Sequence, residues 1–303
     1  MHEKILLVDD EPDFLDVVSE FLREDCGYEV TCANNAEAAL QFVGTTQFDL
    51  VLSDINMPGI KGYELLHLIS LRSPGTKTAL ITAYEVRDYL RWAKDYNIGN
   101  IITKTTPFNF DEMRLLINNI ITEDVFGLGK YVDGTVASTG IHRSLEIEPV
   151  ISQAIDGIPL PAHKRKFRQA LGEIVINTVY YGARNEDGSN KSSWKTDVTL
   201  LPEETVTLSW ATDFEKSGIA IHDQKGRLTK KDVLYWIERN STKNDQNMSL
   251  GLFDEHGKGL FIARETVDRF IINIKHGVST EVILLNYNEG MYHGHRPLWI
   301  NEF

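Results

Sequence analysis

Five polar positions in the first third of the chain have the residue types that phosphoryl chemistry requires. Each lies at the end of an apolar run, and helix-like stretches separate the runs, a pattern typical of repeated βα units with a parallel sheet. Functional groups of such sheets gather where the strands end. Carboxylates, a hydroxyl and an ammonium group are therefore expected at one edge, where oxygen ligands suit magnesium and a carboxylate can accept a phosphoryl group. The polar positions are Asp9-Asp10, Asp54, Asn56, Thr82 and Lys104, and the runs are Ile5–Val8, Phe48–Ser53, Thr78–Ile81 and Ile101–Thr103.

The segment from Asp54 to Gly62, Asp-Ile-Asn-Met-Pro-Gly-Ile-Lys-Gly, resembles the phosphoacceptor loop of two-component receiver domains. The resemblance covers residues 1 to about 122 and implies a doubly wound α/β domain with a five-stranded parallel sheet. It also implies that Asp10 and Asp54 bind magnesium together with the backbone carbonyl of Asn56. Asp54 is then the phosphoryl acceptor.

By the same resemblance, Asp9 assists the metal mostly through water, and Thr82 and Lys104 bind the phosphoryl oxygens. Two positions depart from the family pattern. The proline that usually follows the lysine directly is Pro107 here, and Ile101 stands where the family commonly has a switch aromatic. Phosphoryl acceptance depends on neither position, whereas the usual relay from the threonine to an aromatic ring depends on the second.

Because the switch aromatic is missing, we expect the phosphoryl signal to leave through the surfaces of residues 85–96 and 111–121. Receivers commonly dimerise through that surface, so a symmetric homodimer favoured by phosphorylation is the predicted response. Each exposed ion pair across such an interface contributes only about 0–1 kcal/mol, so a network of pairs would be needed.

The composition excludes several classes of protein. A chain of 303 residues has room for two domains, each with its own core. The net charge of −13 argues against a nucleic-acid partner. No apolar run is long enough to cross a membrane and the first residues lack the pattern of a signal peptide, so a cytoplasmic protein is expected. Cys26 and Cys32 lack metal-ligand spacing and are expected to be reduced thiols.

The sequence beyond residue 122 predicts a second domain of a different class. Residues 123–160 are interpreted as a linker with a short helix near Leu145–Ile155, and residues 161–303 as a folded domain whose aromatic C-terminal tail docks on a surface. Helical and strand patterns are segregated there, which indicates a two-layer α+β sandwich. The expected helices are 163–181, 229–239 and 259–270, and the expected strands are 205–210, 218–222, 271–275 and 280–285.

Three features of this second domain point to a nucleotide. Glu173 and Asn177 are four residues apart and share a helix face, where they can position water beside a metal-bound phosphate. Asp223 ends an apolar strand, and its carboxylate can accept a hydrogen bond from an adenine amino group. Gly257 and Gly259 open a helix whose free N–H groups suit a phosphate.

The ordered set resembles the Bergerat-type ATPase fold of gyrase, Hsp90, histidine kinases and anti-sigma serine kinases, and it is most similar to the last branch. The resemblance covers about 149–287 and implies ATP and magnesium as cofactors. Asn177 then holds the metal, Asp223 reads adenine, and Glu173 is the candidate general base. The remaining family positions are Gly226 in the G1 box, Gly257 and Gly259 in the G2 box, where they clear space for phosphates, and Thr280 on the closing strand. The G1 box departs from the pattern because Lys225 and Arg227 replace two glycines.

Together these resemblances predict a bacterial response regulator that is phosphorylated by a cognate histidine kinase and controls a fused ATP-binding domain. The output is either serine/threonine phosphorylation of a partner protein or nucleotide-dependent binding of that partner without chemistry. The alternative is a pseudo-ATPase that serves only as an interaction module. A hybrid histidine kinase is disfavoured, because its phosphoacceptor histidine is normally followed by an acid, whereas His142 and His163 are followed by Arg143 and Lys164.

Overall fold

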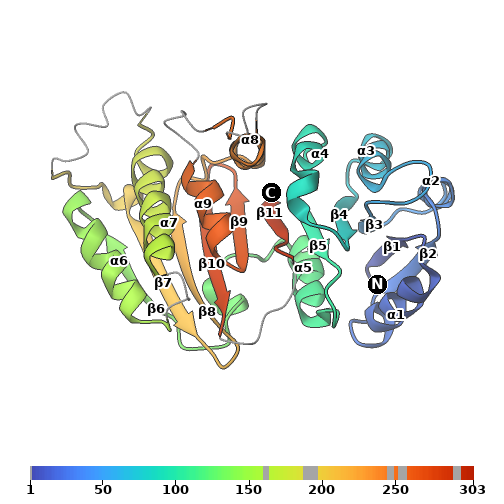
Figure 1. Ribbon diagram of the computed structural model, residues 1–303, viewed down its shortest axis with the longest axis horizontal. Helices are drawn as coiled ribbons and strands as arrows, with labels where there is room; N and C mark the ends of the chain where they lie inside the picture. The colour runs from blue at the N-terminus through green and yellow to red at the C-terminus, as the bar shows by residue number, and fades with distance from the viewer. Residues whose placement is uncertain (1, 160–163, 187–196, 244–248, 252–257, 289–294) are drawn as a thin grey trace. The chain divides into compact units, whose positions relative to one another are not determined.

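A computed structural model describes residues 2–159, 164–186, 197–243, 249–251, 258–288 and 295–303 (Figure 1). The chain divides into two compact units. The first comprises Met1–Val125 and Gly294–Leu298, and the second comprises Phe126–His293 and Trp299–Phe303. Each unit is described here by itself.

The first unit is built on a parallel five-stranded sheet with the order β2-β1-β3-β4-β5. Ile5 to Val8 in an interior strand are buried on both faces of the sheet, as expected where helices cover a parallel sheet. The predicted α/β receiver fold is confirmed. Its strands are β1 Lys4–Val8, β2 Glu29–Ala33, β3 Leu50–Asp54, β4 Lys77–Thr82 and β5 Asn100–Thr103, and its helices are α1 Pro12–Glu24, α2 Ala36–Val43, α3 Gly62–Arg72, η1 Val86–Tyr89, α4 Leu90–Asp95 and α5 Phe110–Thr122.

The second unit is a sheet with the order β11-β9-β10-β8-β7-β6, in which only the β11–β9 pair is parallel. Helices α6, α7 and α9 lie over one face of this sheet (Figure 1). We call this the helix face and the opposite one the back face. The strands are β6 Ala137–Ile141, β7 Val206–Thr212, β8 Lys216–Asp223, β9 Arg269–Lys275, β10 Ser279–Tyr287 and β11 Leu298–Glu302. The helices are α6 Ile147–Asp156, α7 Lys164–Asn177, the π-helical segment η4 Thr178–Ala183, α8 Lys230–Ser241 and α9 Lys258–Thr266, with short 3-10 turns η2 Leu128–Lys130, η3 Ser144–Glu146 and η6 Pro202–Glu204.

Three elements of the second unit differ from the sequence-based expectation. The segment interpreted as a linker contains β6, which pairs with β7; its residues are mostly exposed and show no apolar alternation, so no pattern predicts this edge strand. The helix expected over 259–270 ends at Thr266, and Phe270 instead belongs to β9. The aromatic tail forms β11, whose Trp299 and Ile300 pair with Ile271 and Ile272 of β9. A tail of mixed residues becomes a strand because β9 offers it an open edge.

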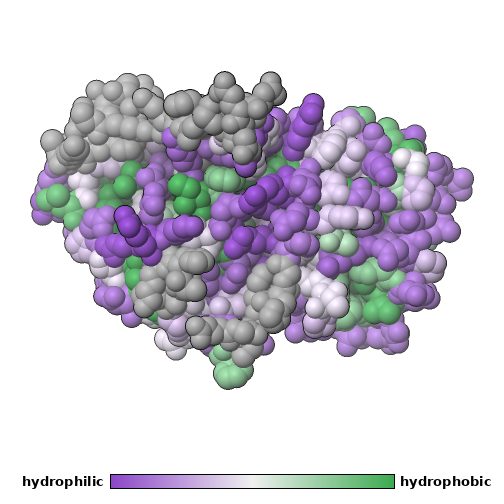
Figure 2. Space-filling model, viewed as in Figure 1, coloured by the Kyte–Doolittle hydropathy of each residue, from purple (hydrophilic) through white to green (hydrophobic). Residues whose placement is uncertain are grey.

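On the face shown in Figure 2, hydrophobic residues lie in small separate patches among hydrophilic ones, consistent with the net charge of −13. Within the part of the chain that the structure describes, no helix is both long and apolar enough to span a membrane. Cys26 and Cys32 are both free thiols.

Candidate functional site

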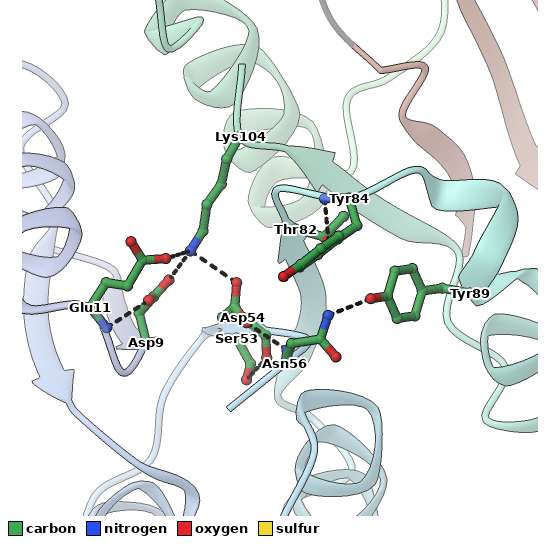
Figure 3. Close-up of polar contacts among 9 residues, drawn as sticks. All are labelled: Asp9, Glu11, Ser53, Asp54, Asn56, Thr82, Tyr84, Tyr89 and Lys104. Carbon is green, nitrogen blue, oxygen red and sulfur yellow. Dashed lines mark hydrogen bonds and ion pairs between the residues drawn. The ribbon is translucent and has the colours of Figure 1, made fainter. Parts of the chain in front are cut away.

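The ends of β1, β3 and β5 bring two aspartates and a lysine together in the first unit. The Nζ atom of Lys104 lies 2.8 Å from Oδ2 of Asp9 and 2.9 Å from Oδ1 of Asp54 (Figure 3). A third carboxylate, Glu11, lies 3.1 Å from the same nitrogen. Only 10% of the Lys104 side chain is exposed. The ammonium group therefore holds two buried carboxylates at a distance that their repulsion would otherwise prevent.

Asp54 is oriented by the loop that follows its strand. Its Oδ2 accepts a hydrogen bond of 2.6 Å from the backbone N–H of Asn56. The loop then turns back so closely that a Cβ atom on Gly62 would lie 2.0 Å from the carbonyl oxygen of Asp54. The position of Asp54 therefore requires glycine at position 62 for steric reasons.

Electrostatics at this cluster keep the lysine charged. Burial alone would lower the pKa of Lys104, but hydrogen bonds to Asp9 and Asp54 outweigh it and raise that pKa above its usual range. Burial raises the pKa of Asp9, and the contacts with Lys104 and the backbone of Glu11 oppose that rise. The cluster thus presents a fixed positive charge beside the Asp54 carboxylate.

The other two predicted receiver residues lie near Asp54 with partners of their own. The hydroxyl of Thr82 is buried and accepts a hydrogen bond of 3.1 Å from the N–H of Tyr84. The side-chain amide of Asn56 donates to the hydroxyl of Tyr89, which projects from η1 toward the site (Figure 3). Position 101 is a buried isoleucine in β5, so Tyr89 is an aromatic residue that reaches the site from a different element. No local sequence pattern marks this contact, because Asn56 and Tyr89 are 33 residues apart.

The predicted magnesium ligands are not assembled in this geometry. Asp9 is fully buried and paired with Lys104, whereas Asp10 is exposed. Among the described residues, no three His, Cys, Asp or Glu side chains come together as a metal-binding group. The available donors are nevertheless carboxylate and carbonyl oxygens, which are the ligands that magnesium prefers. The donor chemistry therefore fits that ion, provided that the Asp10 side chain turns toward Asp54.

A second candidate site is a cavity of about 410 Å³ in the second unit, between the helix face of the sheet and the surrounding helices. Three predicted nucleotide residues line it: Asn177, Asp223 and Thr280. The remaining lining residues are Ile174, Thr178, Tyr181, Gly182, Asn185, Glu186, Arg227, Leu228, Asp232, Trp236, Leu260 and Val282.

Asp223 and Thr280 are direct partners in the β8–β10 register, so both side chains lie on the helix face. One carboxylate oxygen of Asp223, Oδ1, accepts hydrogen bonds from the N–H groups of Lys225 and Gly226 at 2.8 and 3.1 Å. The other oxygen, Oδ2, lies on the side of Gly182, where a Cβ atom would approach it to 3.2 Å. The hydroxyl of Thr280 is buried and has no hydrogen-bond partner among the described residues. A buried polar atom without a partner costs free energy unless a ligand satisfies it.

The structure separates the other predicted nucleotide residues from the cavity. Glu173 is exposed and does not line it. Gly259 packs against α7, because its Cβ would lie 2.9 Å from Cβ of Glu173 and 3.3 Å from the amide nitrogen of Asn177. Gly226 has φ of +58° and lets the chain pass the Lys275 carbonyl, which a Cβ would meet at 2.1 Å. Gly257 lies outside the described residues.

Several lining residues were missed because they come from segments without a motif, notably Tyr181, Asp232 and Trp236. Arg227, a departure from the G1 pattern, does line the cavity, whereas Lys225 does not. One guanidinium nitrogen of Arg227 donates to the carbonyls of Gly182 and Ala183, both at 2.7 Å. Arg227 thus ties the end of η4 to the loop after β8.

A parallel sheet with buried aspartates and a lysine at its strand ends defines the class of α/β signalling domains that accept phosphoryl groups. Residues 5–118 match the model of the response regulator receiver domain family. The sporulation initiation phosphotransferase F of Bacillus subtilis is 32% identical over 114 residues, which are 38% of this chain and 90% of that protein. This chain belongs to the response regulator receiver family.

Another relative and two solved structures also match part of this chain. The response regulator protein FleR of Pseudomonas aeruginosa is 35% identical over 146 residues, or 48% of this chain, and the match spans only 30% of FleR. A receiver domain from Methanospirillum hungatei aligns with 30% identity and a TM-score of 0.38 over 41% of this chain and 96% of that one. TrrA from Thermotoga maritima, in complex with Mg(2+)-BeF, aligns with 36% identity and a TM-score of 0.36 over 39% and 98% of the two chains. The chain thus carries a receiver domain of the kind found in bacterial two-component response regulators, and its match spans less than a third of the length of FleR.

Proposed function

We propose that Asp54 accepts a phosphoryl group from a phosphohistidine of a separate histidine kinase, and that this reaction controls nucleotide binding in the second unit. The observation that carries the first half is the Lys104 ammonium group held between Asp9 and Asp54 at 2.8 and 2.9 Å.

In the proposed transfer, Oδ1 or Oδ2 of Asp54 attacks the phosphorus atom, a P–O bond forms, and the P–N bond breaks with its electron pair returning to the imidazole. Lys104 neutralises charge on the transferred oxygens, and the buried hydroxyl of Thr82, which accepts from the Tyr84 N–H, donates its own hydrogen to one of them. Magnesium, bound by Asp10, Asp54 and the Asn56 carbonyl with Asp9 close by, would supply further charge stabilisation when present.

The test of the receiver reaction is labelling of the full chain with acetyl phosphate in the presence of magnesium. We expect one acid-labile acyl phosphate, lost completely in Asp54→Asn and retained in Asp95→Asn, whose carboxylate lies half-exposed at the end of α4. Label that persists in Asp54→Asn, or that forms equally well with magnesium chelated, would contradict the assignment.

For the second unit, we propose that the cavity binds ATP. The support is chemical: Oδ2 of Asp223 and the unpartnered hydroxyl of Thr280 lie side by side in register, which provides an acceptor for an amino group and a hydroxyl beside it. Adenine satisfies both, because its 6-amino group donates to Asp223 and the ring nitrogen beside it accepts from Thr280, whereas guanine has a carbonyl oxygen at position 6 that the Asp223 carboxylate would repel. Asn177, on the same cavity wall, is the candidate to hold a nucleotide-bound magnesium ion.

The geometry favours ATP binding by the second unit without hydrolysis or phosphoryl transfer. Glu173, the candidate general base, is exposed and outside the lining of the cavity, and Gly259 is occupied in packing α9 against α7. A nucleotide-dependent switch acting on a partner protein therefore has better support than serine/threonine phosphorylation. A pseudo-ATPase that binds no nucleotide is the alternative that the departures at Lys225 and Arg227 keep open.

Calorimetry of the full chain with ATP and GTP tests this half of the proposal. We expect preference for ATP, and Asp223→Asn is expected to weaken ATP at least about tenfold, since a hydrogen bond to a charged acceptor is worth about 1.5–3 kcal/mol. Asp213→Asn is the matched control, because Asp213 makes similar backbone contacts at the β7–β8 turn, outside the cavity lining. Equal affinity for ATP and GTP would contradict the role of Asp223, and absence of binding would favour the pseudo-ATPase.

A further inference from the structure

The first residues of the second unit contact the back face of its sheet. The N–H of Gly127 donates to both carboxylate oxygens of Glu281 on β10, at 3.1 and 3.0 Å. The ring of Phe126 packs edge-to-face against the imidazole of His222 on β8, with centroids 6.3 Å apart and an interplanar angle of 86°. These two residues directly follow the receiver in the chain. We call Phe126–Gly127 the linker clasp.

The two residues that the clasp contacts, His222 and Glu281, are each adjacent in sequence to a residue that lines the cavity. His222 and Glu281 are direct partners across the β8–β10 pair, and the next pair is Asp223 and Thr280. Successive side chains of a strand point to opposite faces. The clasp residues therefore hold the back of the same two strands whose adjacent side chains line the cavity on the helix face.

The acceptor of the clasp is fixed in the core of the unit. Glu281 is 5% exposed and accepts a second hydrogen bond, of 3.2 Å, from the side chain of Asn273. Asn273 is itself fully buried, donates to the hydroxyl of Tyr131 and accepts from Asn301 at 2.8 Å. A carboxylate that is held by neighbouring strands in this way cannot follow the linker without moving β10.

We propose that the linker clasp regulates the cavity, so that seating of Phe126–Gly127 on the back face and nucleotide binding on the helix face favour each other. This inference rests on the proposed nucleotide site. A ligand that bridges Asp223 and Thr280 fixes β8 and β10 in one arrangement, and the clasp requires the same two strands. A change in the receiver that shifts residues 123–125 reaches Phe126 through the covalent chain. Linkage then requires that nucleotide binding shifts the clasp by the same factor.

The experiment measures both directions of this coupling in the full-length chain. Phe126→Ala removes the ring contact with His222, and we expect it to weaken ATP binding about fivefold or more, the lower end of typical coupling between sites. Phe126→Leu restores apolar packing and should recover most of the affinity. Phe214→Ala is the matched control, since Phe214 lies at the β7–β8 turn and is 84% exposed. Hydrogen exchange of the wild-type chain should slow at the Gly127 amide when ATP is added.

The outcomes separate the two proposals. If the wild-type chain binds no ATP, the nucleotide site and the coupling both fall. If it binds ATP, but Phe126→Ala binds equally well and exchange at Gly127 is unchanged by ATP, the coupling is wrong and the nucleotide site stands. If Phe126→Ala does not fold, as judged by its thermal transition, the exchange measurement on the wild-type chain decides alone.

Discussion

The receiver site and the cavity of the second unit are opposite solutions to holding polar groups out of water. At the receiver site Lys104 fills the space between Asp9 and Asp54, so the buried charges already satisfy one another. The cavity is hollow, and the Thr280 hydroxyl in it lacks a partner among the described residues. The first site therefore contains paired charges and little space, whereas the second contains space and a polar atom that a ligand could satisfy.

The largest effect should come from removing the central cation of the receiver site. Lys104→Met leaves the carboxylates of Asp9 and Asp54 facing each other, and we expect a loss of about 3 kcal/mol in the free energy of unfolding. Arg227→Met, which removes a cation from the rim of the cavity, should cost no more than about 1 kcal/mol because Arg227 is exposed and bonded only to carbonyls. Urea titrations of both variants at neutral pH make the measurement. Equal losses of unfolding free energy in the two variants would contradict the difference proposed between the receiver site and the cavity.

The next largest effect is expected from steric crowding beside Asp54. Gly62→Ala places a methyl group 2.0 Å from the Asp54 carbonyl, and we expect a loss of about 1–3 kcal/mol together with slower phosphorylation by acetyl phosphate. Gly75→Ala is the control, since nothing lies within 4 Å of its Cβ. Thermal unfolding and labelling rates of the two variants are compared. A Gly62→Ala variant as stable and as fast as Gly75→Ala would show that the loop after Asp54 relaxes freely.

A smaller effect is expected from two threonines with buried hydroxyls. The Thr82 hydroxyl has a hydrogen-bond partner, whereas the Thr280 hydroxyl has none among the described residues. Thr82→Val removes the acceptor of the Tyr84 N–H and should cost about 1 kcal/mol of stability. Thr280→Val removes a hydroxyl without a partner, and we expect unchanged or slightly higher stability, by up to about 1 kcal/mol, together with weaker ATP binding. Chemical denaturation with and without ATP reports both. Destabilisation by Thr280→Val in the absence of nucleotide would mean that the hydroxyl has a structural partner after all.

The smallest effect is a pH dependence at Glu281. Burial raises the pKa of this carboxyl, and hydrogen bonds from Gly127 and Asn273 oppose the rise. A raised pKa in the folded state means that ionisation opposes folding, so stability from this group increases as pH falls through the folded pKa and levels off below the ordinary value. Glu281→Gln should remove that dependence, with a difference from wild type within about 1 kcal/mol that is largest at neutral pH. A difference that grows on acidification would reverse the sign assigned here.

Much of the receiver could be predicted from the sequence because local patterns mark its strands and the polar residues at their ends. The apolar runs ending in Asp9, Asp54, Thr82 and Lys104 specify strands, and parallel strands with short connections must end at one edge. Asp54 is therefore placed by chain order alone. What the sequence could not predict is that Asp10 is exposed while Asp9 pairs with Lys104, because both residues follow the end of β1 and only packing decides which of the two side chains is buried.

In the second unit, the sequence determined most of the helices and strands and marked Asn177, Asp223 and Thr280, whereas the tertiary structure decided which residues surround these three. The register of β10 against β8 alone makes Thr280 the neighbour of Asp223. Residues 137–141 and 298–302 become strands because open sheet edges accept them, although their patterns are weak. The contact of Gly127 with Glu281 joins residues 154 positions apart, and no local pattern carries such a pairing. Local periodicity determines the secondary structure of most segments, whereas burial and strand register determine which residues those segments contact.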